Sequence, residues 1–192
     1  MPGRAYVVRG GTPLHGTMTV GGGKNAATKL IVASLLSSEP VRLGNIPKIG
    51  DVEATLAMVE ALGTQVNWVG EHEVHLLTPH IGSAHVPESF SGRNRIPILL
   101  TAPLLQRTGH AEIPLLGGDD IGNRPVDFHI AGYRALGASV EQKGDLLTFS
   151  AKRLTGAAVT LPYPSVMATE SLILAGVFAE GTTVIRNAAV EP

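Results

Sequence analysis

The residues best suited to do chemistry lie together at 117–127, where two adjacent carboxylates, Asp119 and Asp120, follow a pair of glycines. A helix-start signal follows, Asn123 with Pro125 just inside it, and Arg124 supplies a guanidinium. Glycines allow the backbone conformations of an exposed turn, and a helix start attracts anions. This pattern suits an acid that gives a proton to an anionic substrate. A solvated loop that caps a helix would look the same, and the spacing alone favours that alternative.

A second group of residues suited to bind anions lies at the expected start of another helix. Three glycines precede Lys24 and Asn25, so backbone N–H groups and an ammonium can approach one ligand together. This is not the Walker phosphate-binding pattern, because no serine or threonine follows the lysine. Taken alone, the segment is equally typical of an ordinary glycine-rich turn between a strand and a helix.

The composition describes a globular chain without a broad electrostatic footprint. Of its 192 residues, 44% are hydrophobic and 16% are charged, and the net charge is −1. Nucleic acid and anionic membranes are therefore not expected as partners, and any anion recognition must be local. The chain has no cysteine, which excludes disulfides, thiolate nucleophiles and cysteine–zinc sites. No signal peptide and no apolar run of roughly 20 residues is found, so we expect a cytoplasmic protein.

Histidines at four positions, His72, His75, His80 and His85, raise the question of a metal site. They lack supporting carboxylate or cysteine spacing, so we expect no metal. Trp68 and the few other aromatic residues form no stacking ladder for single-stranded nucleic acid.

The positioning elements follow an internal repeat of about 70 residues, with the order strand, helix, strand, helix, strand, strand. Moving 142 positions along the chain carries Asn45 onto Asn187, each just after an expected strand. We expect helices at 25–36, 51–62, 95–105, 125–136 and 166–179, and strands at 18–20, 41–43, 65–69, 73–77, 111–115, 139–142, 146–150, 159–161 and 183–186. The second and fourth helices end at Ala-Leu-Gly, a glycine stop signal.

The repeats run over about 19–90, 91–155 and 156–192, and the third lacks its second helix and last two strands. The helix at 166–179 is apolar nearly all round, so it is expected to be buried. We therefore expect residues 21–192 to be an incomplete domain that another segment or chain completes, with a self-sufficient short third unit as the alternative. Residues 1–20 are expected to hold two short strands, at 5–9 and 18–20, that can belong to a partner domain.

Related units bring equivalent helix starts to one place, so Lys24 of the first unit, Arg95 of the second and Ser165 of the third are candidates for one basic pocket. A lone arginine at such a position is otherwise usually solvated or paired.

Several motifs in order resemble the enolpyruvyl transferases, in particular those that act on UDP-N-acetylglucosamine. They cover nearly the whole chain: Gly-Gly-Lys-Asn-Ala-Ala at 22–27, Asn-Ile-Pro at 45–47, the Gly-Gly-Asp loop with Arg-Pro-Val-Asp-Phe-His at 117–129, Pro-Ser-Val at 164–166, and the closing segment at 179–192. The resemblance implies an inside-out α/β barrel domain of β-α-β-α-β-β repeats, one of two in the family.

The activity that the resemblance implies is transfer of the enolpyruvyl group of phosphoenolpyruvate to the 3′-hydroxyl of UDP-N-acetylglucosamine, with release of phosphate and without a cofactor. This is the first committed step of peptidoglycan precursor synthesis, on which the cell wall, cell shape and cell division depend. Catalytic positions carry over to Asp119, Lys24 and Arg124. Substrate-binding positions carry over to Asn25, Arg95, Pro125, Val126, Asp127, Phe128, Tyr163, Pro164, Ser165 and Val166.

The proton donor implied at Asp119 is usually a cysteine in this family. An isolated aspartate has a pKa of about 3.9, so Asp119 needs Asp120 and a bound phosphate to raise its pKa against the opposite effect of Arg124. Met167 stands where the family usually has glycine. The half that supplies a further carboxylate and arginines is absent, so we expect no turnover from this chain alone.

Two other functions stay open. The sister activity on shikimate 3-phosphate is disfavoured by Lys24-Asn25, because that group typically has serine after the lysine. The other alternative is a truncated paralogue that binds a UDP-sugar without catalysis.

Overall fold

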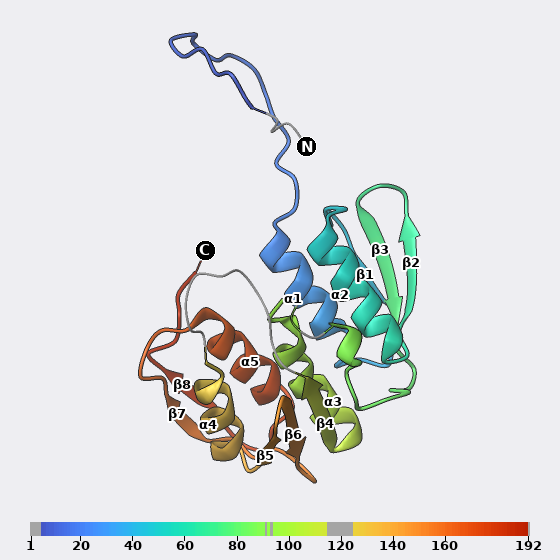
Figure 1. Ribbon diagram of the computed structural model, residues 1–192, viewed down its shortest axis with the longest axis vertical. Helices are drawn as coiled ribbons and strands as arrows, with labels where there is room; N and C mark the ends of the chain where they lie inside the picture. Colours follow the sequence, from blue (N-terminus) through green and yellow to red (C-terminus); the bar gives the residue numbers. More distant parts are fainter. Residues whose placement is uncertain (1–4, 91, 93, 115–124, 192) are drawn as a thin grey trace.

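The protein is described by a computed structural model that covers residues 5–90, 92, 94–114 and 125–191. Three units follow one another along the chain, with helices in the interior and small sheets on the outside (Figure 1). Helices α1 (Lys24–Ser34), α3 (Thr101–Thr108) and α5 (Val166–Gly176) come from successive units and meet through the 3-10 helix η2 (Ile96–Leu100). This arrangement agrees with the inside-out α/β barrel predicted from the sequence.

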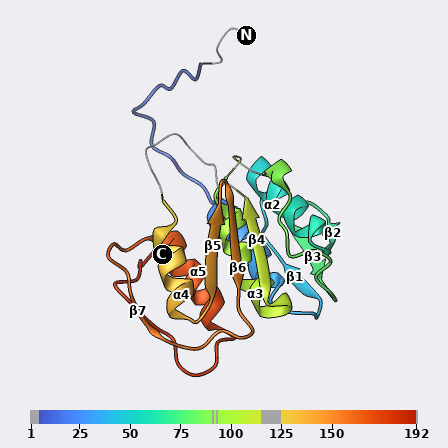
Figure 2. The ribbon, with the colours of Figure 1, turned by 60° about the horizontal axis from the view of Figure 1, so that its bottom comes forward.

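The first two units have the same sheet topology. In the first, β1 (Val41–Leu43), β2 (Gln65–Val69) and β3 (Glu73–Leu77) form an antiparallel sheet of order β1-β3-β2. In the second, β4 (His110–Pro114), β5 (Ser139–Lys143) and β6 (Leu146–Ser150) have the order β4-β6-β5 (Figure 2). The predicted repeat therefore exists in three dimensions.

The third unit consists of β7 (Ala158–Thr160), α5 and β8 (Val184–Arg186) within the described residues. Its two strands pair in parallel, with Val159 opposite Ile185. A short 3-10 helix, η1 (Glu88–Phe90), stands between the first and second units. A parallel bridge between His85, which precedes η1, and Glu112 of β4 resembles the β7–β8 arrangement.

Two asparagines mark the same point in the first and third units. Asn45 and Asn187 have left-handed φ angles of 55° and 54°. Each side chain donates a hydrogen bond to the segment before the first helix of its unit, Asn45 to the Val20 carbonyl at 3.5 Å and Asn187 to the Leu161 carbonyl at 2.8 Å. Asparagine tolerates this conformation better than most residues, which is why it occurs at both positions.

Helix α2 (Gly50–Ala61) packs on α1, and α4 (Asp127–Ala135) packs on α5. Both end as predicted, because Gly63 and Gly137 follow with φ of 110° and 90°, which suit glycine. One continuous core joins all three units, and Tyr133 meets Phe149 edge to face inside it with ring centroids 5.2 Å apart. None of the helices in the described ranges is long and apolar enough to cross a lipid bilayer.

The helix expected at 95–105 is divided into η2 and α3. Pro103 has no N–H to donate to the turn before it, so one continuous α-helix would lose a hydrogen bond there. A 3-10 segment that ends before Thr101 places Pro103 in the first turn of α3, where no N–H is needed.

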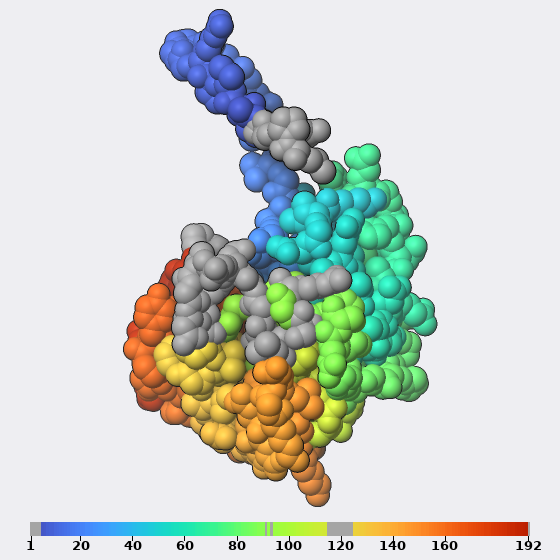
Figure 3. All heavy atoms as spheres, in the orientation of Figure 1, coloured from blue at the N-terminus to red at the C-terminus, as the bar shows by residue number. Residues whose placement is uncertain are grey.

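The two strands expected at 5–9 and 18–20 do not form. These residues lie in an irregular segment that projects from the body, with Tyr6 96% and Leu14 93% exposed (Figure 3). A strand needs a partner strand for its backbone groups, and none of the described strands pairs with this segment. Its assignment to a partner domain stays a prediction.

Helix α5 is less buried than its sequence predicts. Ala168, Leu172 and Ala175 lie in the core, whereas Ile173 is 52% exposed. Val177 and Phe178, which follow the helix, are also exposed. The described residues therefore leave one apolar face of the third unit uncovered.

Candidate functional site

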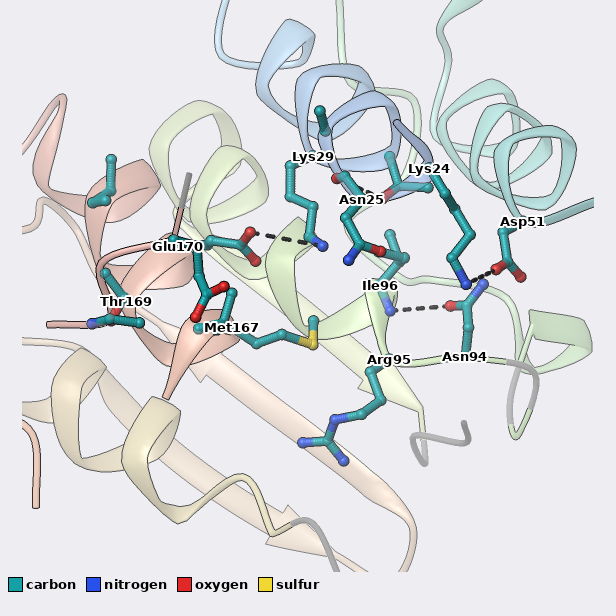
Figure 4. Close-up of a pocket in the computed structure, with 16 residues that line it drawn as sticks. Lys24, Asn25, Lys29, Asp51, Asn94, Arg95, Ile96, Met167, Thr169 and Glu170 are labelled. Atoms are coloured by element: carbon teal, nitrogen blue, oxygen red, sulfur yellow. Dashed lines mark hydrogen bonds and ion pairs between the residues drawn. The ribbon is translucent and has the colours of Figure 1, made fainter. Parts of the chain in front are cut away.

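The inner helix starts of the first and third units face each other across a cavity of about 810 Å³, a size common for small-molecule sites (Figure 4). Its lining comes from α1, the start of α2, the entry to η2, α5 and the closing segment. The described residues that line it are Lys24, Asn25, Ala26, Thr28, Lys29, Asp51, Asn94, Arg95, Ile96, Val166, Met167, Thr169, Glu170, Ile173, Ala189 and Glu191.

Lys24 is the first residue of α1, and its ammonium forms an ion pair with Asp51 of α2 at 2.8 Å. The N-cap residue is Gly23, and none of the described side chains caps this first turn. Backbone N–H groups and a cation thus meet at one end of the cavity, which favours an anionic ligand. Gly22 is required by sterics, because a Cβ there would collide with the carbonyl oxygen of Asn45.

Arg95 stands just before η2 and connects the cavity to the start of α4. Its Nη2 donates a hydrogen bond to the Pro125 carbonyl at 3.4 Å. The neighbouring Asn94 accepts a hydrogen bond from the Ile96 N–H at 3.0 Å, which fixes the turn that carries Arg95. His129 of α4 is 2% exposed, and burial lowers its pKa to about 4, with a smaller contribution from the Arg95 charge.

The opposite wall is the first part of α5. Ser165 is its N-cap, and the hydroxyl accepts a hydrogen bond from the Ala168 N–H at 3.4 Å. The Met167 side chain extends into the cavity toward Arg95, so a bulky thioether occupies space that a glycine would leave open (Figure 4). The Thr169 hydroxyl accepts a hydrogen bond from the Ala189 N–H at 3.0 Å and holds the closing segment against this wall.

The structure brings only some of the sequence-predicted residues together. Lys24, Asn25, Arg95 and Val166 line the cavity. Seven other predicted residues lie at the starts of α4 and α5 and flank the cavity without lining it: Pro125, Val126, Asp127, Phe128, Tyr163, Pro164 and Ser165. Asp119 and Arg124 lie outside the described residues.

Seven of the described polar lining residues were not among the predicted site residues: Thr28, Lys29, Asp51, Asn94, Thr169, Glu170 and Glu191. Lys29 follows Asn25 by one helical turn, so the two lie on the same face of α1, a spacing that could have identified it. Glu170 could not be found this way, because its proximity to Lys29 depends on how the first and third units pack.

Among the described residues, no group of three or more histidine and carboxylate side chains has the geometry of a metal site. Within the part of the chain that the structure describes, the charged lining consists of three cations (Lys24, Lys29, Arg95) and three carboxylates (Asp51, Glu170, Glu191). Such a mixed lining can hold an anion by its cations and accept hydrogen bonds from hydroxyl groups by its carboxylates.

Comparison with known proteins gives consistent results. The sequence profile of EPSP synthase (3-phosphoshikimate 1-carboxyvinyltransferase) matches residues 8–192. A UDP-N-acetylglucosamine 1-carboxyvinyltransferase from Protochlamydia amoebophila is 47% identical, over 96% of this chain and 41% of the relative. The enzyme of the same name from Chlamydia muridarum is 48% identical, over 100% of this chain and 43% of the relative.

Among solved structures, the enolpyruvyl transferase NikO from Streptomyces tendae superposes with a TM-score of 0.79 at 21% identity, over 95% of this chain and 43% of its own. That likeness supports the fold. The chain spans less than half the length of these relatives, and it corresponds to their N-terminal part.

Proposed function

Because the chain belongs to the EPSP synthase family of enolpyruvyl transferases, we propose that it supplies part of an active site that makes enolpyruvyl-UDP-N-acetylglucosamine. The substrates are UDP-N-acetylglucosamine and phosphoenolpyruvate, and the by-product is phosphate. The observation that carries the proposal is the cavity in which Lys24 and Asn25 of the first unit meet Arg95 of the second.

The reaction requires an addition and an elimination. The 3′-hydroxyl oxygen of the sugar bonds to C2 of phosphoenolpyruvate, its proton goes to a base, and an acid protonates the methylene carbon. The C2–O bond to phosphate then breaks, and the methyl group returns a proton. Negative charge is present on the carboxylate and phosphate throughout, so cations are needed to hold the substrate.

We assign that task to Lys24 and Arg95. Lys24 lies beside the first turn of α1, where the helix dipole adds to its charge, and Asp51 holds the ammonium at 2.8 Å. Asn25 adds an amide that can both donate and accept a hydrogen bond. Residues 125–128 and 163–166, around the starts of α4 and α5, are proposed to contact the nucleotide.

Asp119 is proposed as the acid that protonates the methylene carbon, and Arg124 as a further cation. Asp120 and the substrate phosphate would raise the pKa of Asp119 and so keep it protonated at the time of reaction. Replacing Asp119 by alanine should then abolish turnover in a complete enzyme, and near-normal turnover would exclude this role.

The rest of the site is proposed to come from a second enolpyruvyl transferase domain or a companion chain. The exposed apolar residues Ile173, Val177 and Phe178 on and after α5 support a covering segment, since such a patch is costly in water. On this account the isolated chain is inactive, and it acts in the cytoplasm in peptidoglycan precursor synthesis.

The binding part of the proposal can be tested on the isolated chain by ¹H–¹⁵N correlation spectra during titration with UDP-N-acetylglucosamine and phosphoenolpyruvate. We expect the amide signals at the start of α1 and around Arg95 to shift. Lys24→Met should weaken binding about tenfold or more, as expected for a charge-assisted hydrogen bond. Lys152→Met, outside the cavity, is the matched control and should bind normally.

Absence of shifts at both places would contradict the proposal. Shifts with shikimate 3-phosphate in place of the UDP-sugar would favour the sister activity. Signal shifts with the UDP-sugar but none with phosphoenolpyruvate, even when both are present, would favour a non-catalytic binding protein.

A further inference from the structure

Lys29 and Glu170 face each other across the cavity, one from α1 and the other from α5 (Figure 4). Their side chains are 19% and 28% exposed, so both are largely withdrawn from water. The distance from Lys29 Nζ to Glu170 Oε1 is 3.6 Å, which is long for a hydrogen-bonded ion pair. The neighbouring pair of Lys24 and Asp51 is closer, at 2.8 Å.

The carboxylate of Glu170 is poorly satisfied. Its second oxygen, Oε2, is buried and has no hydrogen-bond partner among the described residues. Burial raises the pKa of Glu170, and the charge of Lys29 only partly opposes this. A buried ion pair with incomplete hydrogen bonding gains little from its own attraction, because desolvation opposes it.

The cavity therefore contains a cation whose present partner is weakly held. An entering anion such as a phosphate, sulfate or carboxylate group could offer Lys29 several oxygens at closer range. Lys29 lies one turn beyond Asn25 on α1, so an anion bound at the helix start and one bound at Lys29 would occupy adjacent places in the same cavity.

We propose that Lys29 is an anion-binding residue of this cavity and that the Glu170 carboxylate competes with the ligand for it. The inference deepens the proposed function and rests on it for the identity of the natural anion, one of the acidic groups of the two substrates. Displacement of Glu170 from Lys29 makes anion binding depend on the protonation of Glu170.

The direction of the pH effect follows from the groups around the pair. Lys29 and Lys24 from α1, Arg95 before η2, Asp51 from α2 and Glu191 from the closing segment line the cavity with Glu170. A neutral Glu170 no longer holds Lys29, so anion binding should tighten as pH falls. Protonation of Asp51 and Glu191 would also tighten anion binding as pH falls. The pH dependence that remains in a Glu170 variant measures their contribution, and the part that is lost measures that of Glu170.

Sulfate is a suitable probe, because its charge stays constant between about pH 7.5 and about pH 5. Its affinity for the 192-residue chain can be measured by ¹H–¹⁵N titration. Near neutral pH, Glu170→Gln should bind sulfate about fivefold more tightly than the unsubstituted chain, the effect of removing one competing ion pair. Acidification should tighten binding by a larger factor in the unsubstituted chain than in Glu170→Gln.

Two further variants complete the experiment. Glu180→Gln removes a carboxylate that pairs with Arg153 outside the cavity, so it controls for net charge and should bind like the unsubstituted chain. Lys29→Met should weaken sulfate binding, and adding Glu170→Gln to it should bring no gain. The dispersion of each variant's spectrum shows whether it is folded.

The outcomes separate this inference from the proposed function. If Lys24→Met weakens sulfate binding but Lys29→Met and Glu170→Gln leave it unchanged, the role of Lys29 is wrong and the proposed function stands. If Lys29 and Glu170 behave as expected but phosphoenolpyruvate does not displace sulfate, the role of Lys29 stands and the proposed substrate is wrong. If the folded chain binds no sulfate, the role of Lys29 is wrong, and the titration with the two substrates still decides the proposed function.

Discussion

The buried imidazole of His129 should make the stability of this protein fall on mild acidification. His129 is 2% exposed in α4, and its Nδ1 has no hydrogen-bond partner among the described residues. Burial, with a smaller contribution from Arg95, lowers its pKa from the ordinary 6.5 to about 4. The folded protein therefore keeps this imidazole neutral in the range where the unfolded chain protonates it.

The sign and size follow from proton linkage. The contribution of His129 is fully present above pH 6.5 and is lost as pH falls toward about 4, because only the unfolded chain gains the proton there. With these two pKa values, the free energy of unfolding should fall by about 2 kcal/mol between pH 7 and pH 5.

Urea unfolding followed by circular dichroism at the two pH values measures this loss. His129→Gln should lose about 2 kcal/mol less on acidification than the unsubstituted chain. His80→Gln, at an exposed histidine, is the matched control and should keep the full loss. An equal loss of stability in the unsubstituted chain and in His129→Gln would refute the reasoning.

Further substitutions test the packing between and within the units. Arg107 donates hydrogen bonds to four backbone carbonyls of the first unit, those of Leu35, Ser37, Thr78 and Pro79. Arg107→Met should therefore lower the free energy of unfolding by about 3 kcal/mol. A loss below about 1 kcal/mol, measured by urea titration, would contradict this. The Tyr133 and Ser171 hydroxyl groups share a buried hydrogen bond of 3.0 Å, so Tyr133→Phe should lower the free energy of unfolding by about 1 kcal/mol. The double variant with Ser171→Ala should lose less than the sum of the two single losses. Strictly additive losses would argue against the hydrogen bond. At Gly156 an added Cβ would lie 2.5 Å from the backbone carbonyl oxygen of Thr182, so Gly156→Ala should lower the free energy of unfolding by about 2 kcal/mol or more. Gly21→Ala, where an added Cβ meets open space, is the control and should be nearly neutral in thermal unfolding. Equal effects of the two substitutions would contradict the predicted clash at Gly156.

The sequence predicted those parts of the fold in which local signals and the repeat agree. Strands β2 and β3 alternate apolar and polar residues, and both have the predicted bounds. Glycine ends α2 and α4 as expected, since the left-handed conformation after a helix suits glycine. Asn45 and Asn187 matched in sequence because both units need an asparagine at the same left-handed turn.

Features that depend on tertiary contacts were beyond the sequence argument. The strand expected at 18–20 needs a neighbour that the described residues do not provide. The exposure of Ile173 depends on which segment covers α5. Lys24 and Arg95 line one cavity, as their repeat positions predicted, whereas the Lys29–Glu170 pair joins two units with no shared spacing in the chain.

Phosphate release tests the central claim most directly. The chain would be combined with the remaining C-terminal part of a relative such as the Chlamydia muridarum enzyme and supplied with UDP-N-acetylglucosamine and phosphoenolpyruvate. The account predicts release that requires both substrates and both polypeptides, and that is lost with Lys24→Met or Asp119→Ala but kept with Lys152→Met. Release by the chain alone, or release from the combined polypeptides that persists in Lys24→Met, would contradict it.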